Sequence, residues 1–240
     1  MIVDLFIPCL IDQFYPETGF NMVKVLERVG CTVNYNPAQT CCGQPAWSAG
    51  SKEDCRTLGE KFISEFQNER YIVSPSPACS AFVRTGYNEL FTNSALHNDC
   101  RMVQKNLFEF ADFLVNVLKI SRISATLNAR AVLMTTCYGA RHYGTTHEGR
   151  MLLEKVKGLK LMRYEGEEVC CGFGGNFSLK FPQISSAMAE AKVDAIIASG
   201  AELIIAQEYA CLMHLDGYIK RNNIPLRVMH LADVLAEGWD

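Results

Sequence analysis

The segment "CCGQPAWSAG", residues 41–50, places two adjacent cysteines directly before a glycine, and "VCCGFGGNF", residues 169–177, repeats this arrangement late in the chain. Adjacent cysteines rarely form a disulfide with each other, because the eight-membered ring strains the trans peptide bond between them. The two thiols of each pair therefore have partners elsewhere in the chain or bind one ligand together.

The spacing of the cysteines around these pairs also repeats. A cysteine precedes the first pair by 32 positions and the second by 33, and another follows by 37 and 40 positions. The offset between matching cysteines is 128, 129 and 132 residues, which predicts an internal duplication. The two sets are Cys9, Cys41, Cys42 and Cys79, and Cys137, Cys170, Cys171 and Cys211.

The composition narrows the classes of function. The chain has 240 residues, 49% of them hydrophobic, and a formal net charge of −3, so it has no basic surface for nucleic acid. Residues 1–19 lack the basic segment of a signal peptide, and no apolar run approaches the roughly 18 residues of a transmembrane segment. A cytoplasmic location is expected, where a framework of disulfides among the 11 cysteines is disfavoured.

Short apolar runs alternate with helical patterns in both halves, which predicts parallel βαβ units. The expected fold class is α/β, with two duplicated parallel-sheet, Rossmann-like halves related by pseudo-twofold symmetry. The expected domains are a first repeat over 1–100, a connecting helical segment over 101–130 with a helix at about 103–119, and a second repeat over 131–240. The expected strands cover 2–7, 32–35, 71–74, 131–136, 159–162, 202–207 and 226–230, and the other expected helices 20–30, 51–69, 80–91, 149–157, 183–199, 209–222 and 231–238.

Each cysteine of the two sets follows the carboxyl end of a predicted strand. In parallel sheets these ends meet at one edge, where ligands bind. The four cysteines of each half are therefore expected to converge on one ligand, and Gly43 and Gly172 to allow the tight turn beside it. Cys31, Cys55 and Cys100 have no counterparts, and we expect them to be small buried hydrophobic residues.

Four thiolates can hold a zinc ion or an iron–sulfur cluster. Structural zinc sites generally use close C-x-x-C pairs, whereas these cysteines come from three distant loops, which favours a larger cluster. Three alternatives remain: a zinc-bound scaffold, thiol–disulfide redox chemistry of the adjacent cysteines, and buried thiols without metal.

The motifs "CLIDQFYPETG", "CCGQPAWSAG", "CCGFGGNFSLKFPQIS" and "CLMH" resemble those of the lactate-utilisation protein A family over nearly the whole chain. That family belongs to the cysteine-rich CCG-domain proteins, with one subunit of heterodisulfide reductase and the glycolate oxidase iron–sulfur subunit. The resemblance implies an iron–sulfur electron-transfer component of cytosolic L-lactate oxidation to pyruvate. It implies two partners, a ferredoxin-like iron–sulfur subunit and a third lactate-utilisation subunit, and cluster ligation by both cysteine sets.

The chain departs from the heterodisulfide reductase relatives, which have a fifth cysteine in a final C-x-x-C motif. Here Ser76 stands three residues before Cys79, and Glu208 stands three residues before Cys211. Four cysteines per site favour a cubane 4Fe–4S cluster or a labile cluster over a non-cubane, five-cysteine cluster. Because Tyr138 follows Cys137 where such proteins often have histidine, the first set is the stronger candidate.

Overall fold

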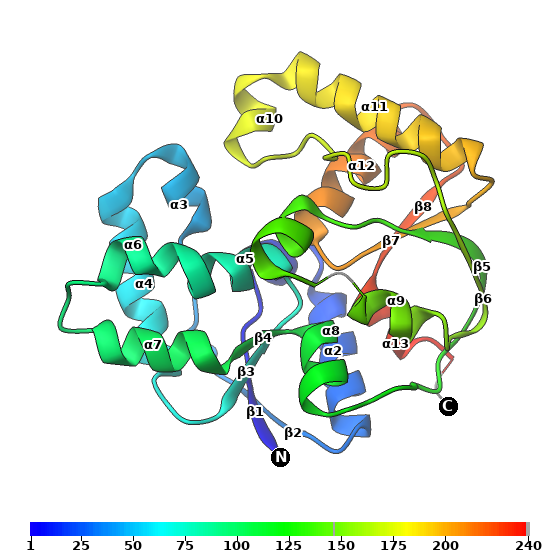
Figure 1. Cartoon of the computed structure of the whole chain (residues 1–240). Coiled ribbons are helices and arrows are strands. Elements are labelled where there is room, and N and C mark those ends of the chain that lie inside the picture. The colour runs from blue at the N-terminus through cyan, green and yellow to red at the C-terminus, as the bar shows by residue number, and fades with distance from the viewer. Residues whose placement is uncertain (146, 239–240) are drawn as a thin grey trace.

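The computed structural model describes residues 1–145 and 147–238, so the last two residues of the predicted second repeat, 131–240, lie outside it. The chain forms two four-stranded parallel sheets flanked by helices (Figure 1). The strand orders, β2-β1-β3-β4 and β6-β5-β7-β8, are the same when matching strands are compared. This confirms the predicted α/β class with two similar Rossmann-like halves.

The elements of the first half, in chain order, are β1 (Ile2–Leu5), α1 (Cys9–Phe14), α2 (Pro16–Arg28), β2 (Thr32–Tyr35), α3 (Gln44–Ala49), α4 (Lys52–Phe66), β3 (Tyr71–Ser74), α5 (Pro77–Ala81), the π-helical turn η1 (Phe82–Gly86), α6 (Tyr87–Phe91), α7 (His97–Asn106), β4 (Leu107–Glu109), α8 (Phe110–Asp112) and the π-helical turn η2 (Phe113–Val117). The second half contains β5 (Thr126–Leu133), the π-helical turn η3 (Gly139–Tyr143), α9 (Glu148–Leu153), β6 (Lys157–Met162), α10 (Asn176–Lys180), α11 (Pro182–Ala198), β7 (Leu203–Ala206), α12 (Tyr209–Arg221), β8 (Arg227–His230) and α13 (Leu231–Ala236). Within the described residues, no helix is both long and apolar enough to cross a membrane.

The helix expected over 103–119 is wrong, because β4 interrupts it and completes the first sheet. Its segment, "FEFADFL" (108–114), matches "MHLADVL" (229–235), which forms the end of β8 and the start of α13. That repeat is a signal for β4 which the cysteine spacing did not show. The division of the chain at residues 100 and 130 stays a prediction, although the segment between them holds β4 and the start of β5.

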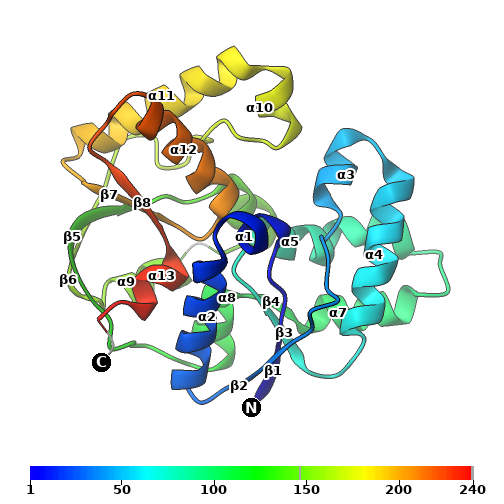
Figure 2. The same cartoon turned by 180° about the vertical axis from the view of Figure 1, so that it is seen from behind.

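The halves pack in a reciprocal manner. Helix α2, after β1, packs on α13, after β8, and α9, after β5, packs in the same way on α8, after β4. Figure 2 shows α2 beside α13 at the centre of the molecule. Nearer the cysteines, α5 packs on η3 and α12 packs on α1. Exchanging the two halves turns the α2–α13 contact into the α9–α8 contact, and the α5–η3 contact into the α12–α1 contact. This is the pattern of a pseudo-twofold axis.

The hydrophobic core crosses the boundary between the repeats. Val3 and Leu5 of β1 belong to the same buried cluster as Val234 and Leu235 of α13. The opposite face of the first sheet, with Ile72 of β3, packs on a smaller cluster under α4, α6 and α7. The alternation follows from the two-residue period of a strand, which sends successive side chains to opposite faces. One face of the first sheet is therefore buried only in the complete chain.

Glu109, at the end of β4, is a fully buried carboxyl group in this interface. Its Oε2 accepts hydrogen bonds from the backbone N–H groups of Ala111 (2.9 Å) and Asp112 (3.1 Å), which caps α8. The buried side-chain amide of Gln207 lies beside this carboxyl group. Burial raises the pKa of Glu109 to about 8.

The first prediction concerns this carboxyl group. The unfolded chain releases the proton near the ordinary value of 4.5, whereas the folded chain keeps it to about 8. The contribution of Glu109 to stability is therefore complete at low pH and is lost as the pH rises through this window, by about 1.4 kcal/mol per pH unit. Glu109→Gln should remove this fall in the free energy of unfolding, measured by urea denaturation between about pH 5 and pH 8. Glu89→Gln, at an exposed position, is the control, and equal slopes in all three proteins would contradict the assignment.

Candidate metal or cluster site

All eight cysteines of the two predicted sets line one cavity of about 420 Å³ between the halves. Each set lies beyond the carboxyl ends of its own sheet, as the strand pattern predicts. The reciprocal packing brings these two edges face to face. The two sets therefore share one cavity, which reasoning on each repeat alone did not predict.

The four thiols of the first set form a chain of contacts. The Sγ atoms of Cys9 and Cys41 are 3.7 Å apart. Cys41 also contacts Cys42, and Cys42 contacts Cys79. The predicted convergence of the first four cysteines is thus present in the structure.

The second set has the same arrangement. Cys170 contacts both Cys137 and Cys171, and Cys171 contacts Cys211. All four thiols of the second set are thus in contact, as in the first set, and the presence of Tyr138 does not change this arrangement. Tyr138 lines the cavity and its ring lies beside the exposed His142 (ring centroids 4.6 Å apart).

The glycine after each pair holds its first cysteine by a backbone hydrogen bond. The N–H groups of Gly43 and Gly172 donate to the Sγ atoms of Cys41 and Cys170, both at 3.4 Å. Both glycines have positive φ, 90° and 94°. A Cβ on Gly172 would also lie 2.7 Å from the carbonyl oxygen of Ser185, so no side chain fits there.

These contacts make the pKa values of the thiols within each set unequal. Hydrogen bonds from Cys42 and Cys9 lower the pKa of Cys41. Hydrogen bonds from Cys137 and Cys171 do the same for the pKa of Cys170. Each set thus stabilises a thiolate, the form that binds metal.

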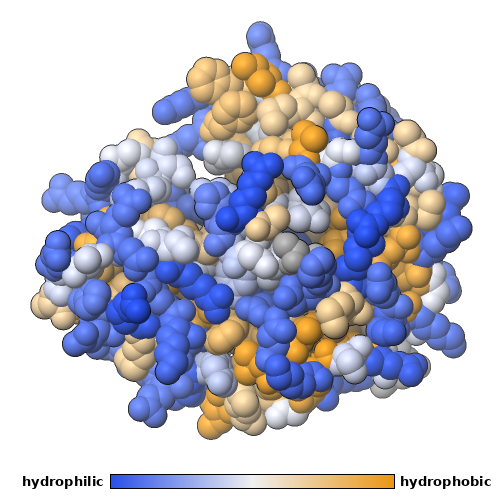
Figure 3. Space-filling model, in the orientation of Figure 1, coloured by the Kyte–Doolittle hydropathy of each residue, from blue (hydrophilic) through white to orange (hydrophobic). Residues whose placement is uncertain are grey.

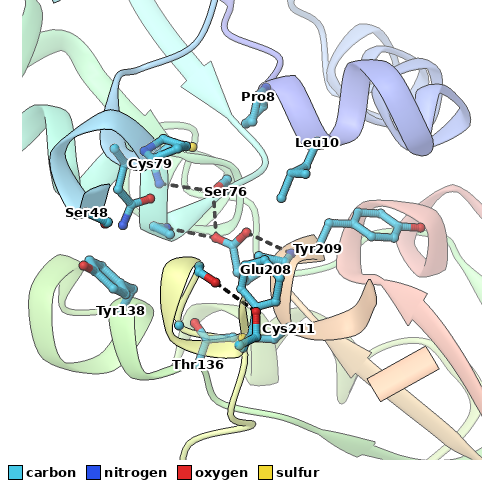
Figure 4. A pocket seen from close by; sticks show the side chains of 18 of the residues that line it. Pro8, Leu10, Ser48, Ser76, Cys79, Thr136, Tyr138, Glu208, Tyr209 and Cys211 are labelled. Atoms are coloured by element: carbon cyan, nitrogen blue, oxygen red, sulfur yellow. Dashed lines mark hydrogen bonds between the residues drawn. The ribbon is translucent and has the colours of Figure 1, made fainter. Parts of the chain in front are cut away.

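Glu208 of α12 joins the two halves across the cavity (Figure 4). Its Oε2 accepts hydrogen bonds from the hydroxyl of Ser76 (2.7 Å) and from the backbone N–H of Ala78 (3.0 Å). Its Oε1 accepts a longer one, 3.3 Å, from the N–H of Ala210 in its own helix. One carboxyl group therefore caps α12 and also the helix of the other half that carries Cys79.

The environment of Glu208 is closed to solvent. Burial raises the pKa of its carboxyl group, while the hydrogen bond from Ser76 opposes the rise. The hydroxyl oxygen of Ser76 in turn accepts from the backbone N–H of Cys79 (3.2 Å). The two residues at the positions of the missing fifth cysteines thus bind each other. The sequence marked both positions but gave no sign of this contact.

The donor set of each half, four thiols from three loops, fits an iron–sulfur cluster. Within residues 1–145 and 147–238, no three or more His, Cys, Asp or Glu side chains are grouped so that they could hold one metal ion. An iron–sulfur cluster takes its four cysteine ligands on different iron atoms, so it does not require all four thiols to surround one point. The cavity between the thiols also has room for atoms other than protein.

The remaining cysteines are buried, as predicted. Cys31, Cys55 and Cys100 are 6%, 0% and 3% exposed, and the structure records them as free thiols. Cys55 packs directly behind the first Cys-Cys-Gly loop, where its sulfur lies 3.2 Å from the place of a Cβ on Gly43. Cys100, on α7, belongs to the same hydrophobic cluster.

His230, which the sequence reasoning did not select, supports the cavity from behind. Its Nδ1 accepts from the N–H of Ala232 (3.1 Å), so its Nε2 carries the proton and donates to the carbonyl oxygen of Pro75 (2.9 Å). Its ring stacks on Tyr209, which lines the cavity. The match between "FEFADF" and "MHLADV" could have identified it as the counterpart of Glu109.

The second prediction concerns the carboxyl group that joins the halves. Glu208→Ala leaves the hydroxyl of Ser76 and two backbone N–H groups without their acceptor, so it should lower the free energy of unfolding by about 3 kcal/mol. Ser76→Ala removes one of these bonds and also the acceptor of the Cys79 N–H, and should cost about 2 kcal/mol. Urea denaturation at neutral pH measures both, with the exposed Glu154→Ala as control. Equal stability of the Glu208 and Glu154 variants would show that the bridge does not hold the halves together.

The sequence matches the family described as "Cysteine-rich domain" over residues 3–84 and 131–216, one match in each half. It is 41% identical over 236 residues to "Lactate utilization protein A" of Halalkalibacterium halodurans, covering 98% of this chain and 96% of the relative. Identity to the Bacillus subtilis protein of the same name is 39%, covering 98% and 99%.

A solved structure of a hypothetical protein from Helicobacter pylori has a similar fold, with a TM-score of 0.58 at 11% identity. That match covers 100% of this chain and 49% of the other, and it supports the fold alone. The matches in sequence extend over both cysteine sets and nearly the full length of the relatives. The chain therefore belongs to the cysteine-rich domain family and, within it, to the family of lactate utilization protein A.

Proposed function

We propose that the chain binds one iron–sulfur cluster, of the 4Fe–4S type, on each cysteine set, and transfers electrons in the oxidation of L-lactate to pyruvate. The observation that carries the proposal is the convergence of four thiols twice around a single cavity. Membership of the lactate utilization protein A family supports the substrate.

The residues that would hold the clusters are the eight cysteines, through their thiolate sulfurs. When bound, such clusters supply one-electron transfer. The chain itself supplies the N–H donors of Gly43 and Gly172 to the sulfurs, which stabilises the thiolate form. The walls of the cavity include apolar side chains, among them Ile11 and Phe173.

Two centres suit the stoichiometry of the reaction. Oxidation of a 2-hydroxy acid to a 2-oxo acid releases two electrons and two protons, and two one-electron centres accept both electrons. The partners that we propose are a ferredoxin-like iron–sulfur subunit and a third lactate-utilisation subunit, in the cytoplasm.

The rim of the cavity has a surface for such a partner. Leu179 of α10 lines the cavity and is itself 80% exposed, and Phe181 and Ile184 beside it are also exposed. Figure 3 shows apolar side chains over α10 and the start of α11, and further apolar patches on the lower part and at the right of the same face.

The third prediction tests the clusters. In anaerobically reconstituted protein, Cys42→Ser and Cys171→Ser should each lower iron and acid-labile sulfide per chain by about half, because each removes one ligand of one centre. Cys100→Ser should keep both contents and is a better control than Cys55, which contacts the loop of the first set. A colourless wild-type protein that binds zinc, without acid-labile sulfide, would favour the scaffold. Reversible loss of thiols without metal would favour thiol–disulfide chemistry.

The fourth prediction tests the pathway. A Bacillus subtilis strain that lacks its 39% identical relative should grow on L-lactate again when it carries this chain or its Cys100→Ser variant. Cys42→Ser should not restore growth. The amount of protein in each strain is measured by immunoblot, so that loss of function is distinguished from loss of the protein. Growth with Cys42→Ser at the wild-type rate would contradict electron transfer through the first set.

A further inference from the structure

A lysine is buried behind the second Cys-Cys-Gly loop. Lys192 of α11 is 3% exposed. Its ammonium group donates hydrogen bonds to the carbonyl oxygens of Gly166 (2.9 Å), Glu167 (3.0 Å) and Val169 (2.7 Å). Three acceptors satisfy all three N–H donors of an ammonium group, so the site is built for a cation. Val169 directly precedes Cys170, which places this cation against the loop of the second set.

The equivalent position in the first half holds an uncharged ring. A Cβ on Gly172 would meet Ser185 and Met188 of α11, and one on Gly43 would meet Cys55 and Leu58 of α4. Both pairs differ by 130 residues, and the same offset places Lys192 opposite Phe62.

Phe62 packs among aromatic rings, with centroids 4.7 Å from Phe6, 4.8 Å from Phe66 and 6.0 Å from Tyr87. The segment before the first Cys-Cys-Gly loop is held by Gln39 instead. This neutral amide accepts from the N–H of Ile7 (2.8 Å) and donates to the carbonyl oxygen of Leu5 (3.2 Å). The segment before the Cys-Cys-Gly loop is therefore held by a cation in the second half and by a neutral group in the first.

The charges around Lys192 do not cancel it. The carboxylate of Glu167, which also interacts with Lys192, lies 2.8 Å from the guanidinium of Arg163 and 4.0 Å from that of Arg150. Two arginines thus already balance Glu167. The strongest electrostatic partners of Lys192 are the sulfurs of Cys171, Cys170 and Cys211, ahead of Glu167. Its ammonium group also lies 5.0 Å from the ring centroid of Tyr164.

We propose that Lys192 gives the second cysteine set a fixed positive charge where the first set has the uncharged Phe62, so that the centre on the second set has the higher reduction potential and takes up an electron first. This inference rests on the proposed function. The physical reason is that each centre becomes more negative by one charge when it is reduced, and a buried cation nearby stabilises that form. One electron is added from an external donor, and no bond forms or breaks.

The first test measures reduction potentials. The variants are Lys192→Gln, which keeps polar contacts but not the charge, and Lys192→Arg, which keeps the charge. Lys220→Gln, whose side chain is 76% exposed, is the control for net charge. In a titration with dithionite followed by electron paramagnetic resonance, reconstituted wild-type protein should show two steps, of which Cys171→Ser lacks the upper one.

Lys192→Gln should lower the upper step by about 60 mV, a tenfold change in a one-electron equilibrium, and leave the lower step in place. Lys192→Arg and Lys220→Gln should leave both steps unchanged. A shift of the lower step, or no shift in Lys192→Gln, overturns the proposal.

The second test needs no metal. The apo chain is treated at one pH with either of two aromatic disulfides, the dianionic dithiobis(nitrobenzoate) or the neutral dithiodipyridine. The rate at which each reagent modifies Cys170 is followed by peptide mass spectrometry. A nearby cation attracts the dianion, so the rate with the dianionic reagent divided by the rate with the neutral one should fall about tenfold in Lys192→Gln. It should stay constant in Lys192→Arg and Lys220→Gln.

An unchanged ratio in Lys192→Gln overturns the proposal whether or not clusters form, provided that thermal unfolding shows the variant to be folded. If Lys192→Gln does not fold, a Lys192→Arg protein with wild-type ratio and potentials supports the role of the charge, and one with altered values contradicts it. A wild-type chain that takes up no iron contradicts the proposed function and the difference in reduction potential. The ratio of the two modification rates would still test whether Lys192 places a positive charge at the second set.

Discussion

The carboxyl edges of two parallel sheets face each other in this protein, and every feature of the cysteine cavity depends on that arrangement. A parallel sheet sends all its strand ends, and the loops that follow them, to one edge. Duplication provides two such edges, and reciprocal packing of α5 on η3 and of α12 on α1 closes them over a common space. Glu208 then completes the contact, because its carboxyl group caps a helix of each half.

The sequence was sufficient to predict the features that both halves share, but not how the two halves pack on each other. Cysteine spacing and strand order predicted two similar halves and the convergence of each set, since both depend on local connections. The sharing of one cavity depends on how the halves pack, and no periodicity reports that. The strand β4 was missed because its apolar residues continue the pattern of α7, although the match of "FEFADFL" with "MHLADVL" was available.

Duplicated sites need not remain equal, and the residues behind the two Cys-Cys-Gly loops show how they diverge. The parts that shape the loop are the same in both halves, including the positive φ of the glycine and its hydrogen bond to sulfur. The support behind the loop differs, with Phe62 in one half and Lys192 in the other. Side chains that touch no ligand thus allow charge to change while the geometry of the thiols is kept.

The pairing of α2 with α13 has a consequence for synthesis of the chain. Helix α2 leaves the ribosome long before α13, and each buries its apolar face on the other. While translation continues, the nascent first half has an uncovered hydrophobic surface and only half of its cavity wall. The thiols of the first set therefore remain accessible until the loops of the second half, which form the other side of the cavity, have folded over them.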